Sequence, residues 1–150
     1  MRRTIIIFSA FILVCCSNND RDPENVPLGF SDTLLIWDTN ADSMIMKKDA
    51  TIPDSVITIH RVVNGLNSKY PEVHIELKKQ SGDTVYIDIP NGEYLGNQMG
   101  SAGATEWFAD ATINLTSVPG INYVSFRMDT FSHAGSTVIG GDEYKNWKKQ

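Results

Sequence analysis

The sequence contains very little cysteine. Only two cysteines occur in 150 residues, and they stand side by side at positions 15 and 16. Beyond residue 16 the chain can therefore form neither an internal disulfide nor a cysteine zinc cluster. Basic side chains are also outnumbered, with 13 Lys and Arg against 18 Asp and Glu, and the net charge is −5. This balance excludes the basic surface of a nucleic-acid-binding protein, so we expect no nucleic-acid partner.

Hydrophobic residues are plentiful by comparison. They make up 41% of the chain, and charged residues 21%. A chain this apolar is unlike a disordered one, and its length supports one domain with a modest core.

The N-terminus has the order of a secretory signal. Residues 1–3 include two arginines, and the ten residues 5–14 are apolar except for one serine. As a helix, ten residues span about 15 Å, roughly half the hydrocarbon thickness of a bilayer. The sequence therefore predicts a signal peptide over residues 1–15 and no permanent transmembrane helix.

The end of this segment, Leu13-Val14-Cys15-Cys16, resembles a bacterial lipobox. In that pattern a leucine stands three residues before the cysteine that becomes acylated, with small residues between them. The resemblance implies acylation of Cys16 with fatty acids such as palmitate. Cys15 is the alternative, but it would place the bulky Val14 directly before the cut. The protein is thus expected to be a lipoprotein of the bacterial cell envelope, anchored at the outer membrane and either periplasmic or surface-exposed.

Residues 16–27 are polar and contain three acidic residues and two prolines. This composition predicts an extended tether without packed structure. An acidic stretch after the acylated cysteine also resembles the surface-export signal of lipoproteins in one group of Gram-negative bacteria. A plain solvated linker explains the composition equally well, and both interpretations stay open.

The pattern of a folded domain begins at residue 28. An apolar run over residues 33–38 predicts a buried strand. Apolar residues at helical spacing over residues 54–68 favour a helix, although residues 56–59 are rich in strand formers. Residues 72–78 and 84–89 alternate apolar with polar side chains, which predicts two strands joined by a tight turn at 81–83.

A second helix is predicted over residues 103–116, where apolar side chains form one stripe, and a strand over 121–128. Residues 131–150 are expected to form a loop and a short helix that packs Tyr144 and Trp147 against the body. The predicted class is α/β (α+β). A small mixed β-sheet carries two helices on one face, in the order β-α-β-β-α-β, followed by a C-terminal extension.

Residues 100–129 carry the most distinctive pattern of the chain. The residues concerned are Gly100, Ser101, Glu106, Leu115, Thr116, Pro119, Gly120, Ile121, Val124, Phe126 and Asp129. This pattern resembles the GerMN (sporulation and spore germination) domain, and the resemblance covers residues 32–130. It departs from the family at Thr130, where glycine is usual. The resemblance implies an envelope-anchored interaction module, here a GerMN-like domain over residues 28–130, and brings no catalytic residues with it.

A glycine-rich stretch precedes the second predicted helix and is the candidate binding loop. It contains Gly96, Gly100, Ser101 and Gly103. Its spacing matches neither a P-loop nor a dinucleotide fingerprint, so a structural loop is the favoured interpretation. Three histidines, at positions 60, 74 and 133, have no partner at metal-ligand spacing. We therefore predict no metal and no cofactor.

The leading functional prediction is a non-catalytic lipoprotein that binds an envelope protein or glycan through its sheet or the candidate binding loop. A surface cluster of aromatic residues would mark such a binding patch. The candidates are Trp37, Tyr94, Tyr144 and Trp147. A small-ligand carrier would instead need an enclosed apolar cavity.

The alternative is an envelope hydrolase that uses Asp, Glu and His133. Ser132 and His133 near Asp129 are the residue types of a catalytic triad, but no Gly-x-Ser-x-Gly elbow is present. Convergence of His133, Asp129 and another polar group in one pocket would favour the hydrolase. Strand-end carboxylates such as Asp38 and Asp88 are expected to be solvated rather than catalytic.

Overall fold

The computed structural model describes residues 31–131 and 133–150. The predicted signal peptide (residues 1–15), the acylation site Cys16 and the tether (residues 16–27) lie outside the described residues. Within the described ranges, no helix has the length and apolar character that a membrane span requires.

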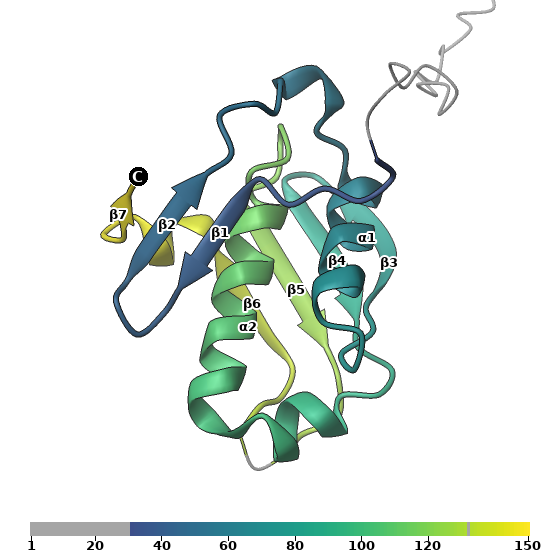
Figure 1. Ribbon diagram of the computed structural model, residues 1–150. Helices are drawn as coiled ribbons and strands as arrows, with labels where there is room; N and C mark the ends of the chain where they lie inside the picture. Colours follow the sequence, from purple (N-terminus) through teal and green to yellow (C-terminus); the bar gives the residue numbers. More distant parts are fainter. Residues whose placement is uncertain (1–30, 132) are drawn as a thin grey trace, which may run out of the picture.

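Two sheets and two main helices make up the fold (Figure 1). The larger sheet has the order β3-β4-β5-β6, and the smaller one β1-β2-β7. The strands are β1 (Trp37–Asn40), β2 (Ile45–Lys48), β3 (Glu76–Ser81), β4 (Thr84–Asp88), β5 (Tyr123–Arg127), β6 (Thr137–Gly140) and β7 (Lys148–Lys149). The pairs β4–β5 and β2–β7 are parallel, and the other pairs are antiparallel. The predicted α+β class is confirmed, but the strands form two sheets instead of one.

Helix α1 (Ile59–Lys69) starts later than the predicted helix. A short 3-10 helix, η1 (Asp54–Val56), precedes it, and the chain is extended at Ile57 and Thr58. Branched side chains at these positions favour extended backbone, which explains both the ambiguous pattern and the later helix start. The helix prediction is thus confirmed for residues 59–68.

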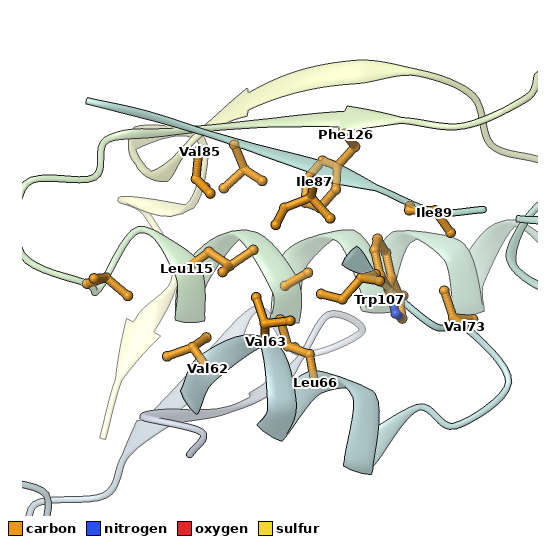
Figure 2. Close-up of a cluster of buried hydrophobic side chains, with 14 of the residues drawn as sticks. Val62, Val63, Leu66, Val73, Val85, Ile87, Ile89, Trp107, Leu115 and Phe126 are labelled. Atoms are coloured by element: carbon orange, nitrogen blue, oxygen red, sulfur yellow. The ribbon is translucent and has the colours of Figure 1, made fainter. Parts of the chain in front are cut away.

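Helix α2 (Gly100–Leu115) lies on the same side of the larger sheet as α1 (Figure 1). Most of its predicted apolar stripe is buried: Trp107 and Leu115 have no exposed surface, and Phe108 is half-buried. Side chains of α1, α2 and β4 meet in one hydrophobic cluster (Figure 2). Each large apolar side chain buried there contributes about 1.5–3 kcal/mol to stability, so this cluster holds the helices on the sheet.

The hairpin β3–β4 is formed as predicted, and Gly82 in its turn has a φ of +60°, which glycine adopts without strain. Strand β3 begins later than expected. The Asn67 side chain bonds both the N–H of Ile75 (2.8 Å) and its C=O (3.0 Å). Because this amide takes the place of a neighbouring strand, regular pairing starts only at Glu76.

Residues 131–150 differ from the predicted loop and short helix. They contain two strands, β6 and β7, with a 3-10 helix, η3 (Gly141–Tyr144), between them. The run of β-branched residues at 137–139 accounts for β6. The predicted packing of this segment against the body is confirmed, because Trp147 is 9% exposed and Tyr144 contacts it with ring centroids 5.2 Å apart.

Candidate functional site: an aromatic-lined groove

A polar row on α2 holds strand β1 in place. Glu106, Asp110 and Asn114 stand four residues apart and so share one helix face. The side-chain amide oxygen of Asn114 accepts hydrogen bonds from the N–H groups of Ile36 (2.7 Å) and Trp37 (2.9 Å). The side-chain NH₂ group of Asn114 donates to the C=O of Trp37 (3.1 Å). The side chain of Asn114 therefore acts as a strand partner for the start of β1.

Asp110 is a fully buried carboxylate at the centre of this row. It accepts hydrogen bonds from the hydroxyls of Thr39 and Tyr70, both at 3.0 Å, and pairs with Lys69 Nζ at 2.8 Å. Burial and the nearby charge of Asp110 raise the pKa of Tyr70, so the phenol stays protonated. Burial opposes the charge of Lys69, but the carboxylates of Asp110 and Asp38 together outweigh this and raise its pKa. The partners of Asp110 come from β1 and the end of α1, so this cluster fastens both to α2.

A groove of about 490 Å³ lies between the end of α2, the smaller sheet and the first residues of β5. Three aromatic side chains line it: Trp37 from β1, Tyr123 from β5 and Tyr144 from η3. Met46 and Ile113 contribute buried apolar surface. The groove therefore brings together segments that are far apart in the sequence.

Two of the three aromatic rings of the groove are held in place by the fold. The indole N–H of Trp37 donates to Ser117 Oγ at 2.9 Å, which fixes the ring against the end of α2. Tyr144 contacts Trp147 edge to face, and burial raises its pKa, so its phenol is protonated at neutral pH. Tyr123 is 43% exposed. A ligand would thus meet two rings that are already oriented, those of Trp37 and Tyr144.

The polar side of the groove is also pre-arranged. The Asn122 amide donates to the Asp83 carboxylate at 3.0 Å, and the Asn122 C=O accepts the N–H of Gly141 at 3.0 Å. These bonds join the β3–β4 turn, the start of β5 and η3. Asp142 and Lys145 line the same groove, and with Asp83 and Lys149 they give it two charges of each sign.

A second hollow of about 580 Å³ lies on the other side of β1. Its charged lining consists of Asp38, Asp49, Lys47, Lys48 and Lys69. It lacks the aromatic walls of the first groove, since Trp37, which borders both, is its only aromatic lining residue among those the structure describes.

Of the four aromatic residues expected to mark a binding patch, Trp37 and Tyr144 line the groove. Tyr94 packs against the main core, and Trp147 is buried beneath Tyr144. Tyr123 was not among the candidates. Its place at the start of an alternating strand gave no signal, because alternation predicts only that its side chain points away from the core.

The candidate binding loop packs against the segment that follows β5. Gly96 lies in a short π-helix, η2 (Tyr94–Gln98), and a Cβ there would come within 2.2 Å of Phe131 Cβ. Gly100 opens α2 with a φ of +69°, and a Cβ at Gly103 would lie 2.9 Å from Met99 Cβ. Ser101 bonds His133. None of these four residues lines the groove or the second hollow. The close contacts of the glycines favour the interpretation that this stretch is a structural loop rather than a binding loop.

The residues of the hydrolase alternative are only partly brought together. Ser101 Oγ lies 3.0 Å from His133 Nδ1, but no hydrogen bond joins Asp129 to His133 among the described residues. Ser132 lies outside them. His60 and His74 are exposed, and within residues 31–131 and 133–150 no group of three or more His, Cys, Asp or Glu side chains could hold a metal.

The strand-end carboxylates are engaged in ion pairs. Asp88 pairs with Arg127, and with Lys78 at 3.5 Å. The hydrogen bond from Arg127 holds the pKa of Asp88 below its usual value. This is opposite to the raised pKa that a general acid needs. Asp38 is exposed and lies 3.5 Å from Lys69 Nζ.

No protein-family model, curated protein or solved structure matches the chain. The resemblance to the GerMN domain therefore stays a prediction, and any assignment of a ligand to the groove has to rest on the chemistry of the groove itself.

Proposed function

We propose that this protein is a non-catalytic, lipid-anchored binding module of the bacterial cell envelope, acylated at Cys16. It binds another envelope component in the aromatic-lined groove. The observation that carries the proposal is the convergence of Trp37, Tyr123 and Tyr144, from three distant segments, on one open groove.

Aromatic side chains suit recognition because each offers a large contact area with few rotatable bonds. Here Trp37 and Tyr144 are also fixed by their contacts with Ser117 and Trp147. Less conformational entropy is then lost when a ligand binds, so more of the contact energy appears as affinity.

The polar groups of the groove support holding a ligand more than transforming it. Asp83 is bonded by Asn122. Ser117 accepts the indole N–H of Trp37 and donates to the C=O of Ile113 at 2.8 Å, so its hydroxyl is already used. Among residues 31–131 and 133–150, the one Ser–His hydrogen bond joins Ser101 to His133, and neither residue lines the groove.

The predicted anchor fits a role at the membrane surface. Even when fully extended, residues 17–30 would span at most about 50 Å, so the folded domain would stay within that distance of the bilayer. Its ligand would then be a component of the same envelope layer, as expected for a scaffolding or binding module.

Site-specific photo-crosslinking in living cells tests this proposal. A photoreactive phenylalanine analogue in place of Tyr123 is expected to capture an envelope component. The same analogue at Tyr86, on β4 and outside the groove lining, serves as the matched control. Equal capture at both positions, or none at Tyr123, would refute the groove as the binding site. Mass spectrometry of the membrane-extracted protein tests the anchor separately, because an unmodified N-terminus upstream or downstream of Cys16 contradicts it.

A further inference from the structure

The size of the groove favours a small polar ligand over a protein surface. Its volume of about 490 Å³ lies within the range of small-molecule sites, about 300–1,000 Å³. A stable protein partner covers about 800 Å² on each side and needs a contiguous apolar centre. The described surface exposes only three large hydrophobic side chains, Met44, Tyr123 and Val138, and only Tyr123 lines the groove.

The charges of the groove argue against a polyanion. Asp83 and Asp142 balance Lys145 and Lys149, so the lining carries no net charge. A nucleic acid or a phosphate-rich polymer would meet two carboxylates there and gain little from the two lysines. The balance suits a ligand that is neutral and rich in hydrogen-bonding groups.

Sugar rings combine the two properties that the groove offers. The axial C–H groups of a pyranose form apolar faces, which pack on aromatic rings such as those of Trp37, Tyr123 and Tyr144. Its hydroxyl groups lie at the ring edges, where carboxylate oxygens accept them in pairs. Asp142 is exposed at the groove wall. One oxygen of Asp83 accepts the Asn122 amide at 3.0 Å, and the other accepts only a long bond of 3.4 Å from the Thr84 hydroxyl, which leaves it lone pairs for a ligand.

An acetamido group makes the fit more specific. Met46 and Ile113 line the groove but are only 4% and 5% exposed, so they leave a small apolar area that suits a single methyl group. The N–H of the acetamido group can donate to a groove carboxylate. We infer that the groove binds an oligosaccharide that contains N-acetylated hexosamines. The inference rests on the proposed binding function and names the class of its ligand.

Binding of chitotetraose, a linear tetramer of N-acetylglucosamine, to the purified full-length protein in detergent tests this inference. All three tryptophans emit, but Trp107 and Trp147 are buried, whereas Trp37 is half-buried at the groove, so a fluorescence change on sugar binding reports chiefly on Trp37. We expect a saturable fluorescence change, and a markedly weaker one with cellotetraose, which lacks the acetamido groups. Equal binding of the two sugars would overturn the assignment to N-acetylated hexosamines.

Two variants locate the sugar. Tyr144→Ala and the near-isosteric Asp142→Asn are each expected to weaken chitotetraose binding about tenfold or more, equivalent to about 1.4 kcal/mol. Tyr86→Ala, which changes a tyrosine outside the groove, is the matched control and should bind as the wild type does. Asp142 is exposed, so Asp142→Asn leaves the fold intact even if Tyr144→Ala disturbs it.

Each outcome is decisive. If chitotetraose produces no saturable change and the protein does not co-sediment with peptidoglycan sacculi, the inference is wrong. The same holds if binding is unaffected by Asp142→Asn and Tyr144→Ala. If photo-crosslinking at Tyr123 captures an envelope protein while chitotetraose fails to bind, the proposed binding function stands and the sugar assignment falls.

Discussion

Truncation of Asn114 is expected to destabilise the protein strongly. Asn114→Ala removes the acceptor for two main-chain N–H groups, those of Ile36 and Trp37, and the side chain of Asn114 is fully buried. A buried donor left without a partner costs about 1–3 kcal/mol. This cost applies in full to the buried N–H of Ile36 and only in part to that of Trp37, which is partly buried. The higher helix propensity of alanine offsets at most about 0.7 kcal/mol of this loss in stability. Since small domains are stable by only about 5–15 kcal/mol, this loss would be a large share of the total.

Urea denaturation followed by circular dichroism measures the effect. The matched control is Asn64→Ala on α1, which removes an exposed amide whose hydrogen bond, to the C=O of Asp32, is 3.3 Å long. We expect the control to change the free energy of unfolding by less than about 0.5 kcal/mol. A loss below about 1 kcal/mol for Asn114→Ala would show that β1 does not depend on this amide. The reasoning about how α2 holds Trp37 at the groove would then fail.

Further predictions concern packing, pH and reactivity. Gly96→Ala should lower the melting temperature by several degrees, since its Cβ would overlap Phe131, and calorimetry checks this. The ion pair of Asp88 with Arg127 lowers the pKa of that carboxyl. Its stabilising effect is therefore present above the ordinary pKa of 3.8 and lost as the pH falls through the lowered value. The destabilisation caused by Arg127→Gln should accordingly shrink between pH 7 and pH 3 in matched melts, and a constant difference would contradict this. Ser101 should remain unlabelled by a fluorophosphonate probe, and its stoichiometric labelling, detected by mass spectrometry, would revive the hydrolase alternative.

Local patterns predicted the central part of the fold well. The alternation in β4 and β5 and the apolar stripe of α2 each reflect the burial of one face, which is a property of neighbouring residues. The tight turn at Gly82 is likewise local. These elements appear close to their expected positions because no distant residue is needed to define them.

The division into two sheets depends on contacts that the sequence pattern does not record. Strand β2 pairs with β7, about a hundred residues later, and β1 is held partly by the side chain of Asn114. In a helical pattern, Asp110 and Asn114 look like surface positions. They are buried because their partners come from other elements, as Thr39 does from β1 and Tyr70 from the end of α1.

The groove itself was not predicted, for the same reason. Trp37 and Tyr144 were identified as aromatic candidates, but nothing local brings them together with Tyr123 and Asp83. Parallel pairing of β4 with β5 aligns Thr84 with Tyr123, and this places the β3–β4 turn beside the start of β5. Because residues 131–150 were expected to form a loop and a short helix, the sequence did not indicate that η3 and β7 line the groove.

The parallel ladder between β2 and β7 has a consequence for how the protein matures. Trp37 and Lys149 lie more than a hundred residues apart in sequence, yet the Lys149 ammonium sits 6.0 Å from the centre of the indole. A nascent chain therefore lacks a complete groove until residue 149 has emerged and docked. A molecule bound in the groove would contact both early and late segments of the chain. The free energy of unfolding should therefore increase as more of the protein is ligand-bound.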